Sequence, residues 1–446
     1  MKFTFENLGT IKKTTLDLRP LTVIIGPNNT SKTYLAYCVH GLIANCAGMG
    51  SIGWKAQVDW KKPEVNTLVS MVDEVLGEVG ADLAGNLTEY FQDTRGHLFT
   101  NSRVSWQVDT DDIVSALKRI GYEFDSSNAP VAPKALADFN DSASLVVRVL
   151  DELFLPPITL PAERNALIIT YKMLSTRRYR VLRDRARQLR HRLASPEKRQ
   201  AAERQAALLR EQGDVRYPQP VEDFLDFLTD VELASTRIKN PPNSPFGKLA
   251  SAIEEHIQGG HRTSFEPTAL GGSELALTIG DGARIDLYNA SSSIKQLAPL
   301  LLYLRYRAEE GQTLIVDEPE MNLHPEGQAK LLEALGMLAN LGVRVLLTTH
   351  SPYFMSHLNS LVAADVSSVA RKRRQAQHLY TQDANAFLAP DQVSAYEMRE
   401  EGLVSLADPD YGIRWDTLSD VSSEIQRRYF SIMEEPKTVR RRGQAK

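Results

Sequence analysis

The chain has 446 residues, of which 42% are hydrophobic, and its 52 basic and 56 acidic residues give a formal net charge of 52 − 56 = −4. This length is enough for two or three domains with substantial cores, and the charge balance excludes a general basic field for nucleic acid. The N-terminus has no signal-peptide pattern, and no apolar run approaches the roughly 20 residues that cross a membrane. Two cysteines, Cys38 and Cys46, without a histidine cluster are typical of a reducing compartment. We therefore expect a cytoplasmic protein without a membrane partner.

The N-terminal region predicts two strands, a third strand and a helix in succession. Apolar residues alternate on both sides of a turn at residues 7–9, which is typical of two half-buried strands. Residues 21–25 are apolar and mostly β-branched, so they predict a buried strand. The loop of residues 26–33 follows, and residues 34–44 predict a helix. A strand, a glycine-containing loop and a helix in this order are the context of a phosphate-binding loop.

The rest of the chain alternates between helical segments, short strands and irregular connections. Short strands are predicted at residues 103–108 and 158–160, and apolar strands at 313–316 and 343–348. The predicted divisions are an α/β core at 1–50 and 285–370, an inserted α/β segment at 51–155, a helical hairpin arm at 156–220, a helical and β connection at 221–284, and a charged, irregular C-terminal segment at 371–446.

The loop of residues 26–33 carries the groups that bind a nucleoside triphosphate. Backbone N–H groups of such a loop, together with the N-terminus of the following helix, bind phosphate oxygens. Lys32 would reach the β- and γ-phosphates, and the Thr33 hydroxyl would ligate Mg²⁺. Ser31 stands where the usual pattern has glycine, so we expect a local rearrangement or nucleotide binding weakened by ~1 kcal/mol or more. The candidate nucleotide-binding residues are Gly26, Pro27, Asn28, Asn29, Thr30, Ser31, Lys32 and Thr33.

Two later strand ends carry candidate catalytic groups. Asp317 and Glu318 follow an apolar strand, where the first carboxylate would hold Mg²⁺ and the second would orient and deprotonate the attacking water. Acids that cap the next helix are the alternative for this pair, and we interpret Glu320 as such a helix-start acid. His350 follows another apolar strand and would hydrogen-bond the γ-phosphate or the water.

Together these segments resemble the ABC-type ATPase head of the RecF/SMC/OLD group. The resemblance rests on residues 5–9, the phosphate loop, residues 317–320 and His350, and it covers roughly residues 1–50 and 285–365. It implies an α/β fold, the ABC-type ATPase head of the P-loop NTPases, with an inserted helical arm and with ATP and Mg²⁺ as ligands. It also implies that Asp317 is the Walker B metal ligand beside Thr33, and that Glu318 is the catalytic glutamate.

The same resemblance implies a site that is completed by a second subunit. Residues 322–325 are similar to the D-loop, and Arg164 ends a motif in which the arginine lies near the nucleotide. The signature motif, whose serines contact the γ-phosphate bound to the opposite subunit, corresponds to Ser291, Ser292 and Ser293, with Ser293 in place of an expected glycine. ATP would then join two heads into a homodimer or a higher oligomer. An ordinary serine N-cap of the following helix is the alternative for these serines.

The sequence leaves three hypotheses for the biological role. Only 446 − 350 = 96 residues follow His350, and they show no TOPRIM nuclease pattern, so we expect a separately encoded effector. In this organisation the chain resembles the ATPases of the Septu, retron-associated and PARIS anti-phage systems, and the resemblance implies a role in anti-phage defence. The alternatives are a RecF/SMC-like ATPase in DNA repair and a nucleotide-stabilised scaffold with little turnover. An arginine-rich run at 177–192 is a candidate surface for DNA. The alternative is a helix whose arginines pair with acids of the return segment of the hairpin or of a partner protein.

Overall fold

The computed structural model describes most of the chain, with gaps. Its described residues are 1–47, 65–93, 95–121, 123–124, 130–131, 142–174, 217–235, 237–267, 273–280, 282–363, 368–408, 412–414 and 416–434. The arginine-rich run at 177–192, and most of the predicted helical hairpin arm, lie outside these residues. Within the described part of the chain, no helix is long and apolar enough to cross a membrane.

The centre of the molecule is a six-stranded sheet in the order β14-β13-β3-β12-β11-β7. The strands β13, β3, β12, β11 and β7 run parallel, and β14 is antiparallel at one edge. All residues of β3 and β11 are buried, because both faces of a parallel sheet are covered. The six strands are β3 (Leu21–Ile25), β7 (Ile158–Leu160), β11 (Thr313–Asp317), β12 (Arg344–Thr349), β13 (Val393–Arg399) and β14 (Gly402–Ser405).

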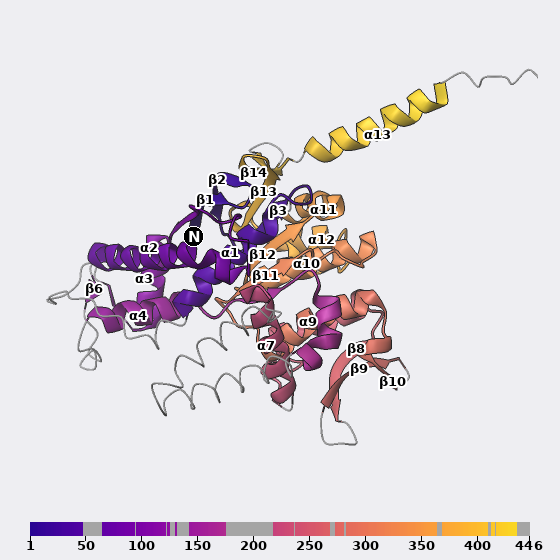
Figure 1. Cartoon of the computed structure of the whole chain (residues 1–446). Coiled ribbons are helices and arrows are strands. Elements are labelled where there is room, and N and C mark those ends of the chain that lie inside the picture. The colour runs from indigo at the N-terminus through magenta and orange to yellow at the C-terminus, as the bar shows by residue number, and fades with distance from the viewer. Residues whose placement is uncertain are drawn as a thin grey trace, which may run out of the picture.

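Two antiparallel three-stranded sheets accompany the central sheet (Figure 1). The first has the order β2-β1-β4 and consists of β1 (Lys2–Leu8), β2 (Ile11–Asp17) and β4 (Arg103–Gln107). The second has the order β10-β9-β8 and consists of β8 (Arg262–Pro267), β9 (Ser273–Ile279) and β10 (Ala283–Asp286). Two short hairpins add β5 (Glu123–Phe124) with β6 (Pro130–Val131), and β15 (Ala407–Asp408) with β16 (Gly412–Ile413).

Helices pack on both sides of the central sheet. The helix α1 contacts β11 and β12, and α10 contacts β3 and β12 from the other side (Figure 1). The helix α13 extends away from the body of the molecule. The helices are α1 (Lys32–Ala47), α2 (Val65–Tyr90), α3 (Thr110–Arg119), α4 (Ser142–Leu153), α7 (Gln219–Leu233), α8 (Pro245–His256), α9 (Ser292–Tyr306), α10 (Pro325–Asn340), α11 (Pro352–Val362), α12 (Val369–Ala376) and α13 (Asp416–Glu434).

The structure confirms the N-terminal hairpin, the buried strand with its loop and helix, and the strands that precede Asp317 and His350. The prediction of an irregular segment from residue 371 was wrong. The strand β13 lies within the central sheet beside β3, and α12 and α13 are helical. The apolar pattern of β13 is interrupted by Glu397, but this carboxylate is buried and paired with Arg399 at 2.6 Å. A charge paired with Arg399 therefore occupies a position at which strands of a covered parallel sheet usually carry an apolar residue.

Candidate functional site

The parallel sheet brings the predicted site residues to one edge. Asp317 at the end of β11 is in register with Thr348 of β12, and Thr349 is in register with Ile25 at the end of β3. The phosphate loop leaves β3 at this edge, and His350 leaves β12 there. In open α/β sheets, ligands bind at the carboxyl ends of the parallel strands. The three predicted motifs therefore form a single candidate site.

Ser31 stands in the phosphate loop in a backbone conformation that favours glycine, and its hydroxyl has partners outside the loop. Ser31 has a φ of +65°, in the left-handed region that glycine adopts more readily. Its hydroxyl accepts a hydrogen bond from the backbone N–H of Thr10 at 3.1 Å and shares another with the Thr10 hydroxyl at 2.8 Å. Gly9 allows this contact, because a Cβ at that position would lie 2.7 Å from the Ser31 Oγ. Ser31 thus ties the phosphate loop to the turn between β1 and β2.

Lys32 begins α1 and is almost fully buried beneath the loop. Its Nζ donates to the carbonyls of Gly26 at 3.0 Å and Pro27 at 2.7 Å. Burial lowers the pKa of Lys32 to about 8, although the nearby carboxylates of Glu318 and Asp317 favour its charged form. An anion bound in the loop would stabilise the ammonium further, so the position and electrostatics of Lys32 suit a phosphate ligand.

Thr33 and Asp317 form an oxygen-rich pair that suits a magnesium ion. The Thr33 hydroxyl donates to Asp317 Oδ2 at 3.1 Å, and the Thr348 hydroxyl donates to Asp317 Oδ1. Asp317 is 4% exposed, and burial raises its pKa to about 6. Mg²⁺ prefers hard oxygen ligands and takes the rest of its shell from phosphates and water. Among the described residues there is no cluster of three or more histidine, cysteine or acidic side chains that would form a separate metal centre.

Glu318 and His350 face each other at the open end of this site. His350 Nε2 lies 3.1 Å from Glu318 Oε1, and both side chains are about one third exposed, at 29% and 32%. Glu318 has a φ of +47°, and its N–H donates to the carbonyl of Thr348 at 3.0 Å. A strained backbone that persists at such a position is characteristic of functional sites. The pair is thus placed to orient a water molecule and to accept a proton from it.

Glu320 has a role that the sequence did not indicate. Its Oε1 accepts hydrogen bonds from the Thr349 hydroxyl and from the backbone N–H of His350, both at 2.7 Å. The interpretation of Glu320 as a helix-start acid was wrong, because α10 begins only at Pro325 and its N-cap is His324. Glu320 instead fixes the backbone that carries His350.

Arg164 is buried beneath the ends of β7 and β11, where its guanidinium contacts backbone carbonyls. The sequence had placed this arginine near the nucleotide. It is 2% exposed, and its guanidinium donates to the backbone carbonyls of Gln296, Pro161, Asp317 and Glu318 at 2.6–3.1 Å. Five fixed donors make arginine suited to such a network. Arg164 therefore joins the ends of β7 and β11 to α9, and its donors are directed to carbonyls.

The three serines of the predicted signature motif lie at the start of α9. Ser291 is the N-cap, and its hydroxyl accepts from the N–H of Ile294 at 3.4 Å and bonds the Ser293 hydroxyl at 2.9 Å. Ser291 and Ser292 are exposed. The N-cap alternative is confirmed, while the contact of Ser291, Ser292 and Ser293 with nucleotide on an opposite subunit stays a prediction.

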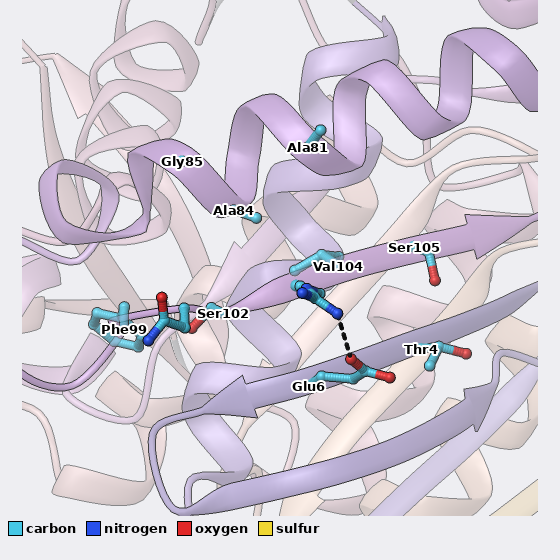
Figure 2. A pocket seen from close by; sticks show the side chains of 11 residues that line it. Thr4, Glu6, Ala81, Ala84, Gly85, Phe99, Ser102, Val104 and Ser105 are labelled. Carbon is cyan, nitrogen blue, oxygen red and sulfur yellow. Dashed lines mark ion pairs between the residues drawn. The ribbon is translucent and has the colours of Figure 1, made fainter.

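A hollow of about 750 Å³ lies elsewhere, between α2, β1 and β4 (Figure 2). Its lining includes small residues of α2, such as Ala81 and Ala84, and a loose ion pair of 3.9 Å between Arg103 and Glu6. None of the predicted site residues lines it. The candidate site is thus defined by the strand ends and the phosphate loop, and this hollow is separate from it.

Sequence reasoning missed two threonines that shape the site. Thr348 donates to Asp317 and could have been found, because it lies near the end of β12 in register with Asp317. Thr10 holds Ser31, but the two residues are 21 positions apart on different elements. This contact depends on the packing of the β1–β2 turn against the phosphate loop, which no local sequence pattern indicates.

One protein family matches part of this chain. Residues 138–356 match the model of a family described as "AAA domain, putative AbiEii toxin, Type IV TA system". This range includes Asp317, Glu318 and His350, while the phosphate loop precedes it. No curated protein matches the chain.

Among solved structures, the chain is similar to a Pyrococcus furiosus Smc head domain with an extended coiled coil, bound to the C-terminal domain of ScpA. The identity is 12% and the TM-score 0.38, with 95% of this chain and 98% of that chain covered. A second structure, an SmcHead bound to the C-winged helix domain of ScpA, gives 10% identity and a TM-score of 0.39, with 92% and 98% covered. Scores at this level assign no partner.

The central parallel sheet, the phosphate loop on β3 and the acidic end of β11 define an α/β fold of the AAA/ABC ATPase kind.

Proposed function

We propose that this chain binds and hydrolyses ATP with Mg²⁺ at the edge formed by β3, β11 and β12. The observation that carries the proposal is the convergence of Lys32, the Thr33–Asp317 pair and the Glu318–His350 pair at one edge of the sheet. Each group has the chemistry that phosphoryl transfer requires, which is mainly positioning and electrostatic stabilisation.

In the proposed reaction, Glu318 accepts a proton from a water molecule that His350 helps to orient. The water oxygen attacks the γ-phosphorus as the bond to the β–γ bridging oxygen breaks, and ADP and phosphate leave. Lys32 stabilises the charge on the phosphate oxygens, and Mg²⁺ held by Thr33 and Asp317 would neutralise the rest. Glu320 and Arg164 act as positioning residues, because they hold the backbones of His350 and of Asp317–Glu318.

We further propose that ATP joins two copies of the chain. The exposed serines at the start of α9 would contact the γ-phosphate held by the other copy, where a helix N-terminus favours an anion. The Glu318→Gln variant should bind ATP without turnover and so accumulate the joined form. Its mass should double on addition of MgATP, whereas Glu318→Gln combined with Ser292→Arg should remain monomeric. An unchanged mass of Glu318→Gln with saturating ATP would contradict this assembly.

The biological role that we favour is control of a separately encoded effector, a nuclease or toxin, in anti-phage defence. The family description supports it only in so far as it names a putative toxin and a type IV TA system. A RecF/SMC-like DNA-binding ATPase fits the fold equally well. The two differ in what binds the chain, so duplex DNA binding should be measured over a range of salt concentrations with residues 177–192 intact and with their arginines changed to glutamine. Strong salt-dependent binding lost in that variant would favour the DNA-binding ATPase.

A further inference from the structure

The helix α13 carries large apolar side chains that lie outside the hydrophobic core. Figure 1 shows this helix extending away from the body of the molecule. Proteins rarely expose several large apolar side chains together unless these form a contact surface. The five exposed apolar residues, with their exposed fractions, are Ile425 at 63%, Tyr429 at 57%, Phe430 at 59%, Ile432 at 73% and Met433 at 66%.

Four of these residues form an apolar stripe along one face of α13. Ile425, Tyr429 and Ile432 are spaced by four and three residues, so their side chains lie above one another on the helix. Met433 continues the same face, because it follows Tyr429 by four residues. Phe430 stands beside the stripe, with its ring centre 5.6 Å from that of Tyr429. The helix therefore has the apolar face of an amphipathic helix, exposed along its length.

The charges of α13 are arranged asymmetrically about this stripe. Glu424 and Arg428 each precede a stripe residue by one position, so both lie on the same flank of the stripe, where they form an ion pair at 2.7 Å. Gln426 and Phe430 each follow a stripe residue by one position and lie on the opposite flank. Among residues 423–433, whose side chains the structure describes, this second flank carries no charge.

This asymmetry favours one way of pairing two such helices. An antiparallel pair brings the same flank of both helices together, whereas a parallel pair brings the charged flank of one helix to the uncharged flank of the other. Two copies of α13 that overlap along their whole length, Asp416–Glu434, meet at Ile425, the middle residue. At about 1.5 Å per residue, Glu424 of one copy then lies within about 3 Å, along the helix axis, of the level of Arg428 of the other copy. Each copy thus offers an acid to the arginine of the other.

We propose that α13 pairs antiparallel with the α13 of a second copy of this chain, with the apolar stripes in contact and with Glu424 and Arg428 pairing between the copies. The contact is isologous, because one surface serves both partners. It needs no nucleotide and is independent of the proposed ATP site. Five side chains at these exposed fractions present less surface than the about 800 Å² that each partner of a standard interface buries, so the dissociation constant should be micromolar.

Sedimentation equilibrium of the full chain without nucleotide, from about 0.5 to 100 µM, tests the pairing. Wild type should pass from monomer to dimer over this range, and Ile425→Asp combined with Ile432→Asp should raise the dissociation constant at least about tenfold. Leu233→Asp is the matched control, because Leu233 is an 80% exposed apolar residue at the end of α7. A chain that stays monomeric throughout, with α13 packed on its own body or reserved for another protein, would overturn the proposal. A dimer that the α13 variant leaves intact would do so too.

The ion pairs between the copies predict a pattern of charge reversal. Arg428→Glu should weaken the dimer about fivefold, and the added change Glu424→Arg should return the affinity to that of wild type. Arg427→Glu is the matched control, because Arg427 is 74% exposed against 75% for Arg428 and also pairs with Glu424, at 3.1 Å. It lies two positions beyond Ile425, on the reverse face of the helix, so its reversal should change the affinity by less than about twofold. Equal effects of the two reversals would overturn the pairing of Glu424 with Arg428 between copies.

Single cysteines test the antiparallel orientation. Gln426 lies near the middle of α13 on a flank that meets itself in an antiparallel pair, so mild oxidation of Gln426→Cys should join two copies by a disulfide. Ile432→Cys should not cross-link, because antiparallel pairing separates its two copies by about 20 Å along the axis. Cys38 and Cys46 are buried and should not react. Cross-linking of Ile432→Cys but not of Gln426→Cys would indicate a parallel pair and would overturn the proposed orientation.

Discussion

Replacement of Ser31 by glycine and by alanine should give an unusual order of stability. A variant with alanine at a given position is normally more stable than the variant with glycine, because glycine loses more conformational freedom on folding. At a φ of +65° a non-glycine residue costs about 1–2 kcal/mol. Ser31→Gly removes this backbone cost but also loses the two hydrogen bonds to Thr10, which are worth about 1 kcal/mol each. The two effects nearly cancel, so the free energy of unfolding of Ser31→Gly should stay within about 1 kcal/mol of wild type. Ser31→Ala keeps the backbone cost and loses the bonds, so it should be destabilised by about 1–3 kcal/mol.

Equilibrium urea unfolding of the two variants at equal m-values measures this order. Ser31→Gly should be the more stable variant by about 1–2 kcal/mol. Ser356 is the control, because it is exposed within α11 and glycine should there be about 1 kcal/mol worse than alanine. If Ser31→Ala equals or exceeds Ser31→Gly, then the left-handed conformation at Ser31 and its tie to Thr10 do not hold.

Three further predictions follow from the buried charges of the site. Asp317 has a pKa raised to about 6, so its buried charge destabilises the fold above that pH. Asp317→Asn should therefore be more stable than wild type at pH 7.5 by roughly 1–3 kcal/mol. In thermal melts without nucleotide, this difference in stability should disappear as the pH falls from about 6 to about 4. Lys32 has a pKa lowered to about 8, so ATP binding at pH 8 should take up about half a proton. Calorimetry in buffers of different ionisation enthalpy measures this uptake, and ATP binding at pH 8 without proton uptake would contradict it. Arg164→Met should destabilise the fold by more than about 3 kcal/mol, because the carbonyls that Arg164 binds lose their donor; an unchanged melting temperature would contradict this.

The sequence predicted those parts of the site that depend on local patterns. The strands β3, β11 and β12 are apolar runs because both faces of the sheet are covered. The phosphate loop follows β3, Asp317 ends β11 and His350 follows β12. Parallel strands bring such ends together, so the grouping of Lys32, Asp317 and His350 could be predicted without coordinates. The left-handed conformation at Ser31 could be predicted too, because the pattern requires glycine there.

The remaining features depend on contacts between distant segments. The strand β13 was missed because Glu397 breaks its apolar pattern, and the pairing of this buried carboxylate with Arg399 is a contact that the local pattern did not indicate. Arg164 was expected at the nucleotide, but four carbonyls from three segments surround its guanidinium. No local pattern distinguishes an arginine that binds phosphate from one that binds backbone carbonyls.

Steady-state phosphate release from MgATP by wild type, Glu318→Gln and Lys32→Met tests the central claim most directly. We predict turnover by wild type, a loss of 10²-fold or more in Glu318→Gln with ATP binding retained, and loss of binding in Lys32→Met. The retained binding would separate the proton-accepting role of Glu318 from a structural one. Equal turnover by wild type and Glu318→Gln, or ATP binding that survives in Lys32→Met, would contradict the assignment of the site.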